Sequence, residues 1–212
     1  FDTATTFYAA QTNIPAIAFD SNSGNSIIAY KNGNGDIGDA VVFVPSGFPV
    51  PETGSTAVFE SAHADHIKAV YDSANGKVVI SYKDVGNSQY GTAIVGTVSG
   101  TSISFGGPII FEYAAINFPD MTFDSTNNKV VIAYSDQGNS NYGTAVVGTV
   151  SGTTITFGTP VKFASNGKTD KIAATFDSTN NRVVIAYEDA GNSSYGTAVV
   201  GQVSGTSITF GS

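Results

Sequence analysis

The sequence predicts an all-β protein built from four tandem repeats of about 52 residues. A Phe/Tyr-Asp-Ser triplet opens each repeat, at residues 19–21, 71–73, 123–125 and 176–178. The last three repeats then share a segment of the type Lys/Arg-Val-Val-Ile-Ala/Ser-Tyr, at residues 77–82, 129–134 and 182–187. A repeat of this length is one supersecondary unit that cannot bury its own apolar face, so the units are expected to stack.

The third repeat shows the pattern of four strands most clearly. Residues 119–123 alternate in polarity, as a strand with one buried face does, whereas residues 129–134 are apolar on both faces, as a central strand is. Residues 142–150 are rich in β-branched and small side chains and predict a third strand. A fourth strand is expected over residues 153–163, at an edge, because it contains Pro160, which cannot donate to a ladder. No helix is expected.

Four antiparallel strands with a polar outer strand form the blade of a β-propeller, so we expect one four-bladed β-propeller domain over residues 1–212. The repeat units are predicted at about residues 11–62, 63–114, 115–167 and 168–212, the last completed by residues 1–10. Residues 1–3 and 210–212 occupy the same repeat position, so the termini are expected to share one outer strand. The alternative is that blades are completed between chains, in a larger ring or a head-to-tail filament.

Composition excludes several classes of partner. The net charge is −8 and Arg182 is the only arginine, so the chain lacks the clustered cations that nucleic acid or an anionic membrane surface requires. No apolar run approaches the ~18 residues of a membrane span, so no membrane insertion is expected. Cysteine is absent, which excludes disulfides and thiolate metal sites. The low-charge surface rich in Ser, Thr, Asn and Gly is typical of extracellular proteins on cell or virion surfaces, and we expect that location.

Three loops of the type Asp-x-Gly-Asn-Ser-x-Tyr carry the candidate ligand-binding residues. The loops span residues 84–90, 136–142 and 189–195, and the candidates are Tyr90, Tyr142, Tyr195, Asn87, Asn139 and Asn192. Tyrosine rings can stack on sugars while amides hydrogen-bond to hydroxyls. In the alternative, purely structural interpretation, Asp and Ser cap the turn, Gly supplies a positive φ and Tyr packs between blades. Each loop has too few carboxylates for calcium, so no cofactor is predicted.

These loops resemble the Asp-box turn of sialidase-type propellers, with Tyr where that motif has an aromatic residue and with one extra residue. The whole unit resembles repeats in β-propeller segments of phage tail fibres and marine bacterial surface proteins. The resemblance implies a propeller fold in which the loop is a structural turn. It does not imply sialidase activity, because those enzymes hold the substrate carboxylate with several arginines and this chain has one. The first repeat departs from the motif, with Asn-Gly-Asn-Gly-Asp at residues 32–36.

Other polar residues carry weaker signals. His63, Asp65 and His66 are the weak metal candidates, because a His-x-x-His spacing on a loop is unspecific and a solvated loop explains it, so no metal is predicted. The aspartates of the Phe/Tyr-Asp-Ser turns are expected to form Asx turns and are assigned no chemistry. The sequon at Asn192 is explained by loop repetition as well as by a glycan.

The leading functional hypothesis is a non-enzymatic structural or adhesive module of an extracellular assembly, which includes a filament subunit that self-associates through its terminal strands. The alternative is a glycan-binding propeller that recognises cell-surface sugars, with weak sites repeated along a polymer. A glycosidase-type enzyme is the third hypothesis, since two carboxylates at a suitable separation can suffice. No catalytic residue is assigned, because no acid pair is singled out in the sequence.

Overall fold

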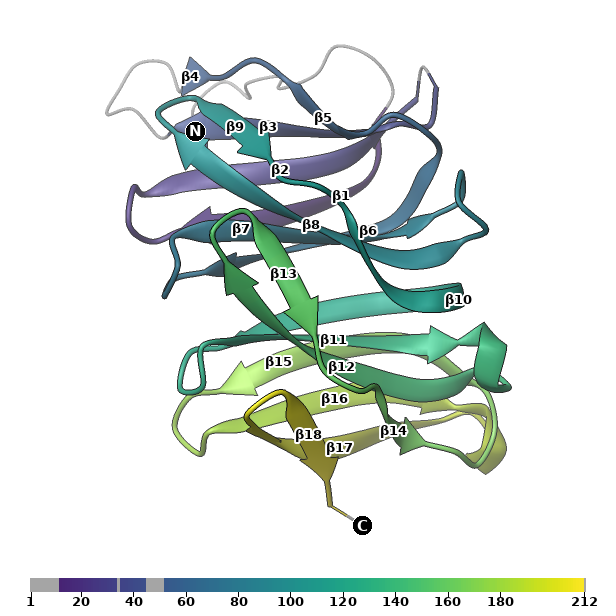
Figure 1. The fold of residues 1–212 in the computed structure, drawn as a ribbon. Coiled ribbons are helices and arrows are strands. Elements are labelled where there is room, and N and C mark those ends of the chain that lie inside the picture. The colour runs from purple at the N-terminus through teal and green to yellow at the C-terminus, as the bar shows by residue number, and fades with distance from the viewer. Residues whose placement is uncertain (1–11, 34, 45–51, 212) are drawn as a thin grey trace, which may run out of the picture.

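The computed structural model describes residues 12–33, 35–44 and 52–211, which form four antiparallel β-sheets in chain order (Figure 1). The all-β prediction is confirmed. The first sheet contains β1 (Thr12–Asp20), β2 (Asn25–Asn32), β3 (Gly38–Val44), β4 (Glu52–Thr53) and β5 (Ala57–Glu60). The second contains β6 (Ala64–Asp72), β7 (Lys77–Asp84), β8 (Tyr90–Ser99), β9 (Ser102–Phe105) and the first half of β10 (Ile109–Asp124).

The third and fourth sheets repeat this plan. The third contains the second half of β10, β11 (Lys129–Asp136), β12 (Tyr142–Ser151), β13 (Thr154–Phe157) and β14 (Val161–Ala164). The fourth contains β15 (Thr169–Asp177), β16 (Arg182–Asp189), β17 (Tyr195–Ser204) and β18 (Ser207–Phe210). Two single 3-10 turns, η1 (Gln137–Asn139) and η2 (Ala190–Asn192), lie in the loops after β11 and β16, where no helix was expected.

In the first three units, the predicted fourth strand is divided into two segments. In the third sheet, β13 pairs with β12 at Gly148–Ser151, and β14 pairs with the same strand at Gly143–Ala145. Pro160 lies in the gap between β13 and β14, because it has no N–H to donate to the β12 ladder. The second short strand leads into the next sheet, and in β10 the two segments are continuous, so that β10 pairs with both β8 and β11.

The four sheets stack face to face in a row, with the first and fourth sheets at opposite ends (Figure 1). Three clusters of buried side chains join the first sheet to the second, the second to the third and the third to the fourth. No such cluster joins the fourth sheet to the first within residues 12–33, 35–44 and 52–211, so these residues form no closed four-bladed ring. The predicted strand shared by the two termini concerns residues 1–10 and Ser212, which lie outside the described residues.

The interfaces between sheets are narrow at the inner strands β1, β6, β10 and β15, which approach one another most closely. Asp120 of β10 links three of them: its Oδ2 accepts a hydrogen bond from the backbone N–H of Ala174 at 2.7 Å, and its Oδ1 lies 3.4 Å from the Lys68 ammonium. Towards the outer strands the interfaces are filled by aromatic rings, such as Phe111, which packs on Tyr134 with 5.3 Å between ring centroids. Each interface is therefore wedge-shaped.

Candidate functional site

The Asp-x-Gly-Asn-Ser-x-Tyr loops each connect the second strand of a sheet to the third. In the second sheet, Asp84 ends β7 and pairs in register with Tyr90, which begins β8. The turn is closed by two backbone hydrogen bonds, from Asn87 N to Asp84 O and from Tyr90 N to Asn87 O, both 3.1 Å. The two residues before the tyrosine have left-handed backbone in all three loops, with Ser88 at φ 57° and Gln89 at φ 63° in this one.

The glycine of each loop has a role that differs from the predicted one. Gly86 is not among the residues with positive φ, so the expectation that it supplies left-handed backbone was wrong. It lies instead against Ala62 of the connection between the first two sheets, and a Cβ at position 86 would overlap the Ala62 side chain. Gly138 meets Ala114 in the same way, where the added Cβ would be 2.5 Å from the alanine Cβ. The glycine therefore permits close approach of the neighbouring loop.

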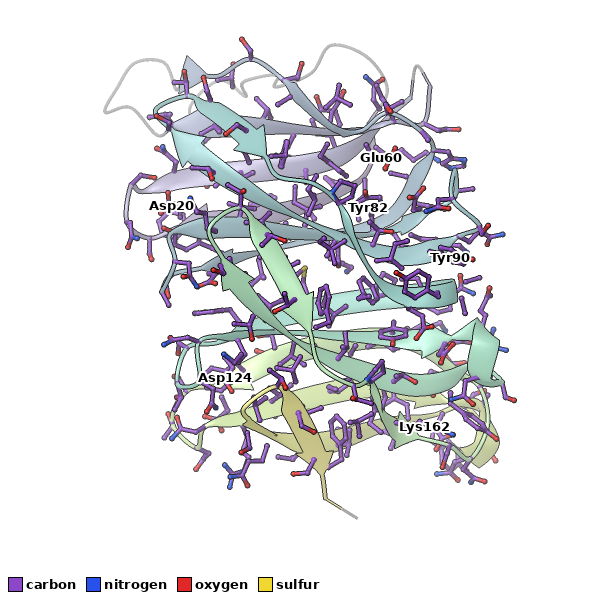
Figure 2. All side chains as sticks on the ribbon, in the orientation of Figure 1. Asp20, Glu60, Tyr82, Tyr90, Asp124 and Lys162 are labelled. Carbon is purple, nitrogen blue, oxygen red and sulfur yellow. The ribbon has the colours of Figure 1, made fainter. Side chains whose placement is uncertain are left out.

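The three candidate tyrosines lie on successive sheets, each in its own surroundings. Tyr90 is half-buried and meets the exposed ring of Tyr113 edge-on, with 5.8 Å between centroids; Figure 2 shows Tyr90 at the right-hand side, midway along the stack. Tyr142 is half-buried with the Lys162 ammonium 5.2 Å from its ring centroid, a cation–π contact. Tyr195 is 62% exposed. The structure therefore repeats the candidates along the stack and does not gather them into one site.

The candidate asparagines lie in the same loops as the tyrosines. Asn87 and Asn192 are exposed, whereas Asn139 is half-buried within η1. The asparagine amide and the tyrosine ring of each loop thus lie at the same end of the strands. This arrangement allows contact with an extended ligand that runs along the stack of sheets.

Two acidic residues near the first of these loops, Glu60 and Asp84, were not predicted as a pair from the sequence. Tyr82 is fully buried, and its hydroxyl donates a hydrogen bond of 3.0 Å to Oε2 of Glu60 (Figure 2). Asp84 is the second acid, and its pKa is raised by burial and by the negative charge of Glu60. Burial, together with Glu60 and Asp84, also raises the pKa of Tyr82 far above its ordinary value.

The next sheet repeats this arrangement. The hydroxyl of the buried Tyr134 donates to Oε2 of Glu112 at 2.9 Å. Burial raises the pKa of Glu112, and the charge of Asp136 adds to that rise, while the hydrogen bond from Tyr134 opposes it. Burial also raises the pKa of Asp136. Asp84, Glu112 and Asp136 therefore each have a pKa above the ordinary value of a carboxyl group.

The described residues form no such acid pair around the buried tyrosines of the first and fourth sheets. Tyr187 is the buried tyrosine of the fourth sheet, and the position that matches Glu112 is Ala164, which follows Phe163 on β14 of the third sheet. In the first sheet, Asn32 replaces the aspartate and donates a hydrogen bond of 2.8 Å to Asp39. The signal that could have revealed the pairs is the Phe-Glu dipeptide at residues 59–60 and 111–112, each 22 residues before the buried tyrosine.

The weak metal candidates point to different neighbours. The ring of His63 lies 3.2 Å from the Lys31 ammonium, which also forms an ion pair with Asp36 at 3.0 Å. His66 has left-handed backbone and packs edge-on against Phe118 on the next inner strand, with 5.7 Å between centroids. Burial lowers the pKa of His66, an effect that Asp65 opposes. The structure does not bring the two histidines and Asp65 together as a ligand set.

The four aspartates of the Phe/Tyr-Asp-Ser turns form the expected Asx turns. Asp124 accepts from the backbone N–H groups of Thr126 and Asn127 at 3.0 and 2.9 Å, and from the Asn127 amide at 2.8 Å. The first turn adds a link to the next sheet, since Tyr71 donates to Asp20. Burial, together with that hydrogen bond, raises the pKa of Tyr71 to about 12. Asp20 and Asp124 lie on the opposite side of the molecule from Tyr90 (Figure 2).

No protein-family model matches the chain, and a search of curated proteins finds no match to its sequence. Among the described residues there is no helix long and apolar enough to cross a membrane.

Proposed function

We propose that the chain is a non-enzymatic structural or adhesive repeat module that associates with further copies of itself in an extracellular assembly, on a cell or virion surface. The apolar surface left on the two end sheets carries this proposal. Ile17 and Phe19 of the first sheet are 65% and 58% exposed, and Val200 of the fourth is 49% exposed. Clustered apolar side chains on a protein surface mark interaction sites, and here they belong to faces that repeat units otherwise bury.

The wedge shape of the interfaces supports a propeller-like arrangement, in which the sheets are blades turned about a common axis beside the inner strands. Four blades would close if the fourth sheet met the first, but no core cluster of the described residues joins them. We therefore favour blades completed between chains, in a larger ring or a filament. This arrangement buries the end sheets in the way that the middle two are buried.

The acid pairs support a structural role better than a catalytic one. A buried tyrosine hydroxyl needs a hydrogen-bond partner, and Glu60 and Glu112 each supply one. The same arrangement recurs in two successive sheets, as a packing device does, whereas an enzyme needs one such site. A glycosidase remains the third hypothesis, and hydrolysis of a polysaccharide that Glu112→Gln abolishes would establish it.

Glycan binding is the second candidate function, and the 62% exposure of Tyr195 favours it. A broad glycan array tests it with the wild-type chain and with Tyr90, Tyr142 and Tyr195 changed to alanine. Binding that falls with each successive change would support a multivalent lectin. Binding that is absent, or that the triple variant retains, would contradict it.

The assembly itself is tested by mass photometry of the 212-residue chain at increasing concentration, followed by electron microscopy of the same samples. Rings or filaments with masses at multiples of 21.8 kDa are expected. Particles that stay at the mass of one chain at every concentration would contradict the proposal.

A further inference from the structure

The fourth sheet lacks a contact that each of the other three sheets makes. In those sheets the strand that leads into the following sheet places a phenylalanine ring over a glycine of the third strand. The pairs are Phe59 over Gly38, Phe111 over Gly91 and Phe163 over Gly143, where an added Cβ would be 2.5, 2.7 and 2.6 Å from the ring Cζ. Each ring also packs on the buried tyrosine of the following sheet. At the matching Gly196 of β17, no atom of the described residues lies within 4 Å of an added Cβ.

The missing ring belongs to a missing strand. Residues Gly143–Ala145 of β12 pair with β14, and the matching residues 196–198 of β17 have no outer strand partner among the described residues. The strand edge at residues 196–198 is open although β18 pairs with Gly201–Ser204 further along β17.

A second glycine of the fourth sheet is also open. Gly54, Gly106 and Gly158 each lie against the tight turn of the following sheet, where a Cβ would overlap the carbonyl oxygen of Thr101, Thr153 and Thr206, respectively. Gly211 is the fourth member of this series, and its added Cβ has no neighbour within 4 Å in the part of the chain that the structure describes.

The outward face of the fourth sheet repeats the residues of a buried face. Val131, Ala133, Ala145 and Val147 of the third sheet are at most 1% exposed, because the fourth sheet covers them. The matching residues, 53 positions later (131 to 184, 147 to 200), are Val184, Ala186, Ala198 and Val200. Three of the four are exposed, and Val184 is half-buried. The fourth sheet therefore has the surface that would receive a following sheet, and none of the four sheets formed by residues 12–33, 35–44 and 52–211 covers it.

The first sheet supplies the complementary face. Ile17 and Phe19 match Ala69 and Tyr71 of the second sheet, which pack on the preceding sheet. Ile17 and Phe19 are themselves largely exposed. The sequence also supplies the ring that Gly196 lacks. Phe7, outside the described residues, lies 12 positions before Phe19 (7 to 19), the separation between Phe59 and Tyr71 (59 to 71).

From these four features we infer that the fourth sheet of one copy is covered by the first sheet of a second copy, head to tail. The segment leading into β1 adds to β17 along residues 196–198, with Phe7 over Gly196. This inference deepens the proposed self-association, on which it rests, by naming the two faces that meet. The contact is heterologous, so it propagates into a ring or a filament.

Two variants of the outward face test the inference by sedimentation velocity across a concentration series. Gly196→Ala fills the space reserved for the ring, and Val200→Lys places a charge at the centre of the face. Both should weaken association at least about tenfold, because a central interface position is disrupted. The matched controls are Gly107→Ala, also in open space, and Val58→Lys, 53% exposed at the rim where the third unit has Lys162. Both controls should associate as the wild type does.

The outcomes separate the two proposals. Wild-type chains that never associate would overturn the proposed function and this inference together. Association that Gly196→Ala and Val200→Lys leave unchanged would overturn the head-to-tail contact alone, and assembly would then use another surface. Circular dichroism melting of the dilute variants confirms that each is folded, since both positions are open in the single chain.

Cross-linking identifies which faces meet, because the chain has no cysteine of its own. Ile17→Cys and Val200→Cys chains are prepared separately, mixed and treated with a short bismaleimide. The head-to-tail contact predicts covalent dimers in the mixture and none in either variant alone. Dimers formed by Val200→Cys alone would show a tail-to-tail contact. A double variant with both Ile17→Cys and Val200→Cys is treated in the same way, and cross-links that form only within its single chains would show that one chain closes on itself. Either result would overturn the inference.

Discussion

The ring of Phe163 lies over Gly143 so closely that a Cβ added to the glycine would be 2.6 Å from the ring Cζ. Phe163 is on the short strand that leaves the third sheet, and it also packs on Tyr187 of the fourth sheet with 5.3 Å between centroids. One side chain therefore joins two sheets, and the absence of a Cβ at Gly143 leaves the space that the ring occupies. The same contact occurs in the first two sheets, whereas no described residue makes it at Gly196 in the fourth.

Gly143→Ala should destabilise the dilute single chain by about 1–3 kcal/mol, because the added methyl group forces the Phe163 ring out of its packed position. Gly196→Ala should change the free energy of unfolding by less than about 0.5 kcal/mol under the same conditions, since its surroundings are open. Urea unfolding followed by circular dichroism measures both. Equal effects at the two positions would show that the ring contact is not what requires the glycine.

Glu112→Gln should increase stability relative to the wild type as the pH rises from about 4 to about 7. The folded-state pKa of Glu112 is raised by burial and by Asp136, so the stability that its proton contributes is present below the ordinary pKa and lost as the pH passes through the raised one. Glutamine keeps an acceptor for Tyr134 and has no such loss.

Glu188→Gln is the control with the opposite sign. The ion pair with Lys171, 2.6 Å long, lowers the pKa of Glu188, so its contribution is present above the ordinary pKa and lost as the pH falls through the lowered value. The glutamine variant should therefore lose stability relative to the wild type as the pH rises. Chemical unfolding at several pH values measures both variants, and the same sign for the two would contradict these assignments.

Asp124→Asn should cost more stability than Asp177→Asn. Both carboxylates accept the same three hydrogen bonds within their turns, but Asp124 is 1% exposed and Asp177 is in an exposed turn. An asparagine provides one acceptor oxygen in place of two, so one donor is left unpaired, which costs about 1–3 kcal/mol where the site is buried. Thermal unfolding of the two variants measures the difference. A larger loss at Asp177 would show that the turns do not act through burial.

Asp120→Ala should destabilise the chain more than Lys68→Ala does. The lysine is 41% exposed, and an exposed ion pair contributes at most about 1 kcal/mol. The aspartate also accepts from the backbone N–H of Ala174 at 2.7 Å, and its loss leaves that donor without its partner. Unfolding in urea compares the two single variants with the double variant. Equal losses from the single variants would mean that the bond between β10 and β15 contributes nothing.

The strands were predictable from the sequence because their signals are local. The apolar run at residues 129–134 has two buried faces in β11, and the Asx turn at Asp124 follows from the preferences of Asp and Asn. The division of the fourth strand at Pro160 was less visible, because strand propensity continues on both sides of the proline. The open stacking of the four sheets could not be predicted from the sequence, because the angle between sheets depends on how rings such as Phe111 pack on Tyr134 across an interface.

The candidate site was predictable to the same degree. The loop position of Tyr90 and Asn87 follows from the turn motif, and the structure presents both at one edge. The acid pairs were missed because Glu112 and Tyr134 are separated by 22 residues and meet only when β10 and β11 are folded. The function of Gly86 was also misassigned, since close contact with Ala62 is a property of two sheets and not of one turn.

Hydrogen–deuterium exchange of the wild-type chain, followed by mass spectrometry at low and high concentration, tests head-to-tail stacking most directly. Residues 196–198 pair with β16 on one side, so only those of their backbone amides that face the open edge should exchange quickly in dilute solution. These amides should become protected as chains associate, because a strand of the second copy pairs with β17. The matching residues 143–145 already pair with β14 and should show no change. Protection that appears elsewhere while residues 196–198 stay unprotected would contradict the stacking of fourth sheet on first.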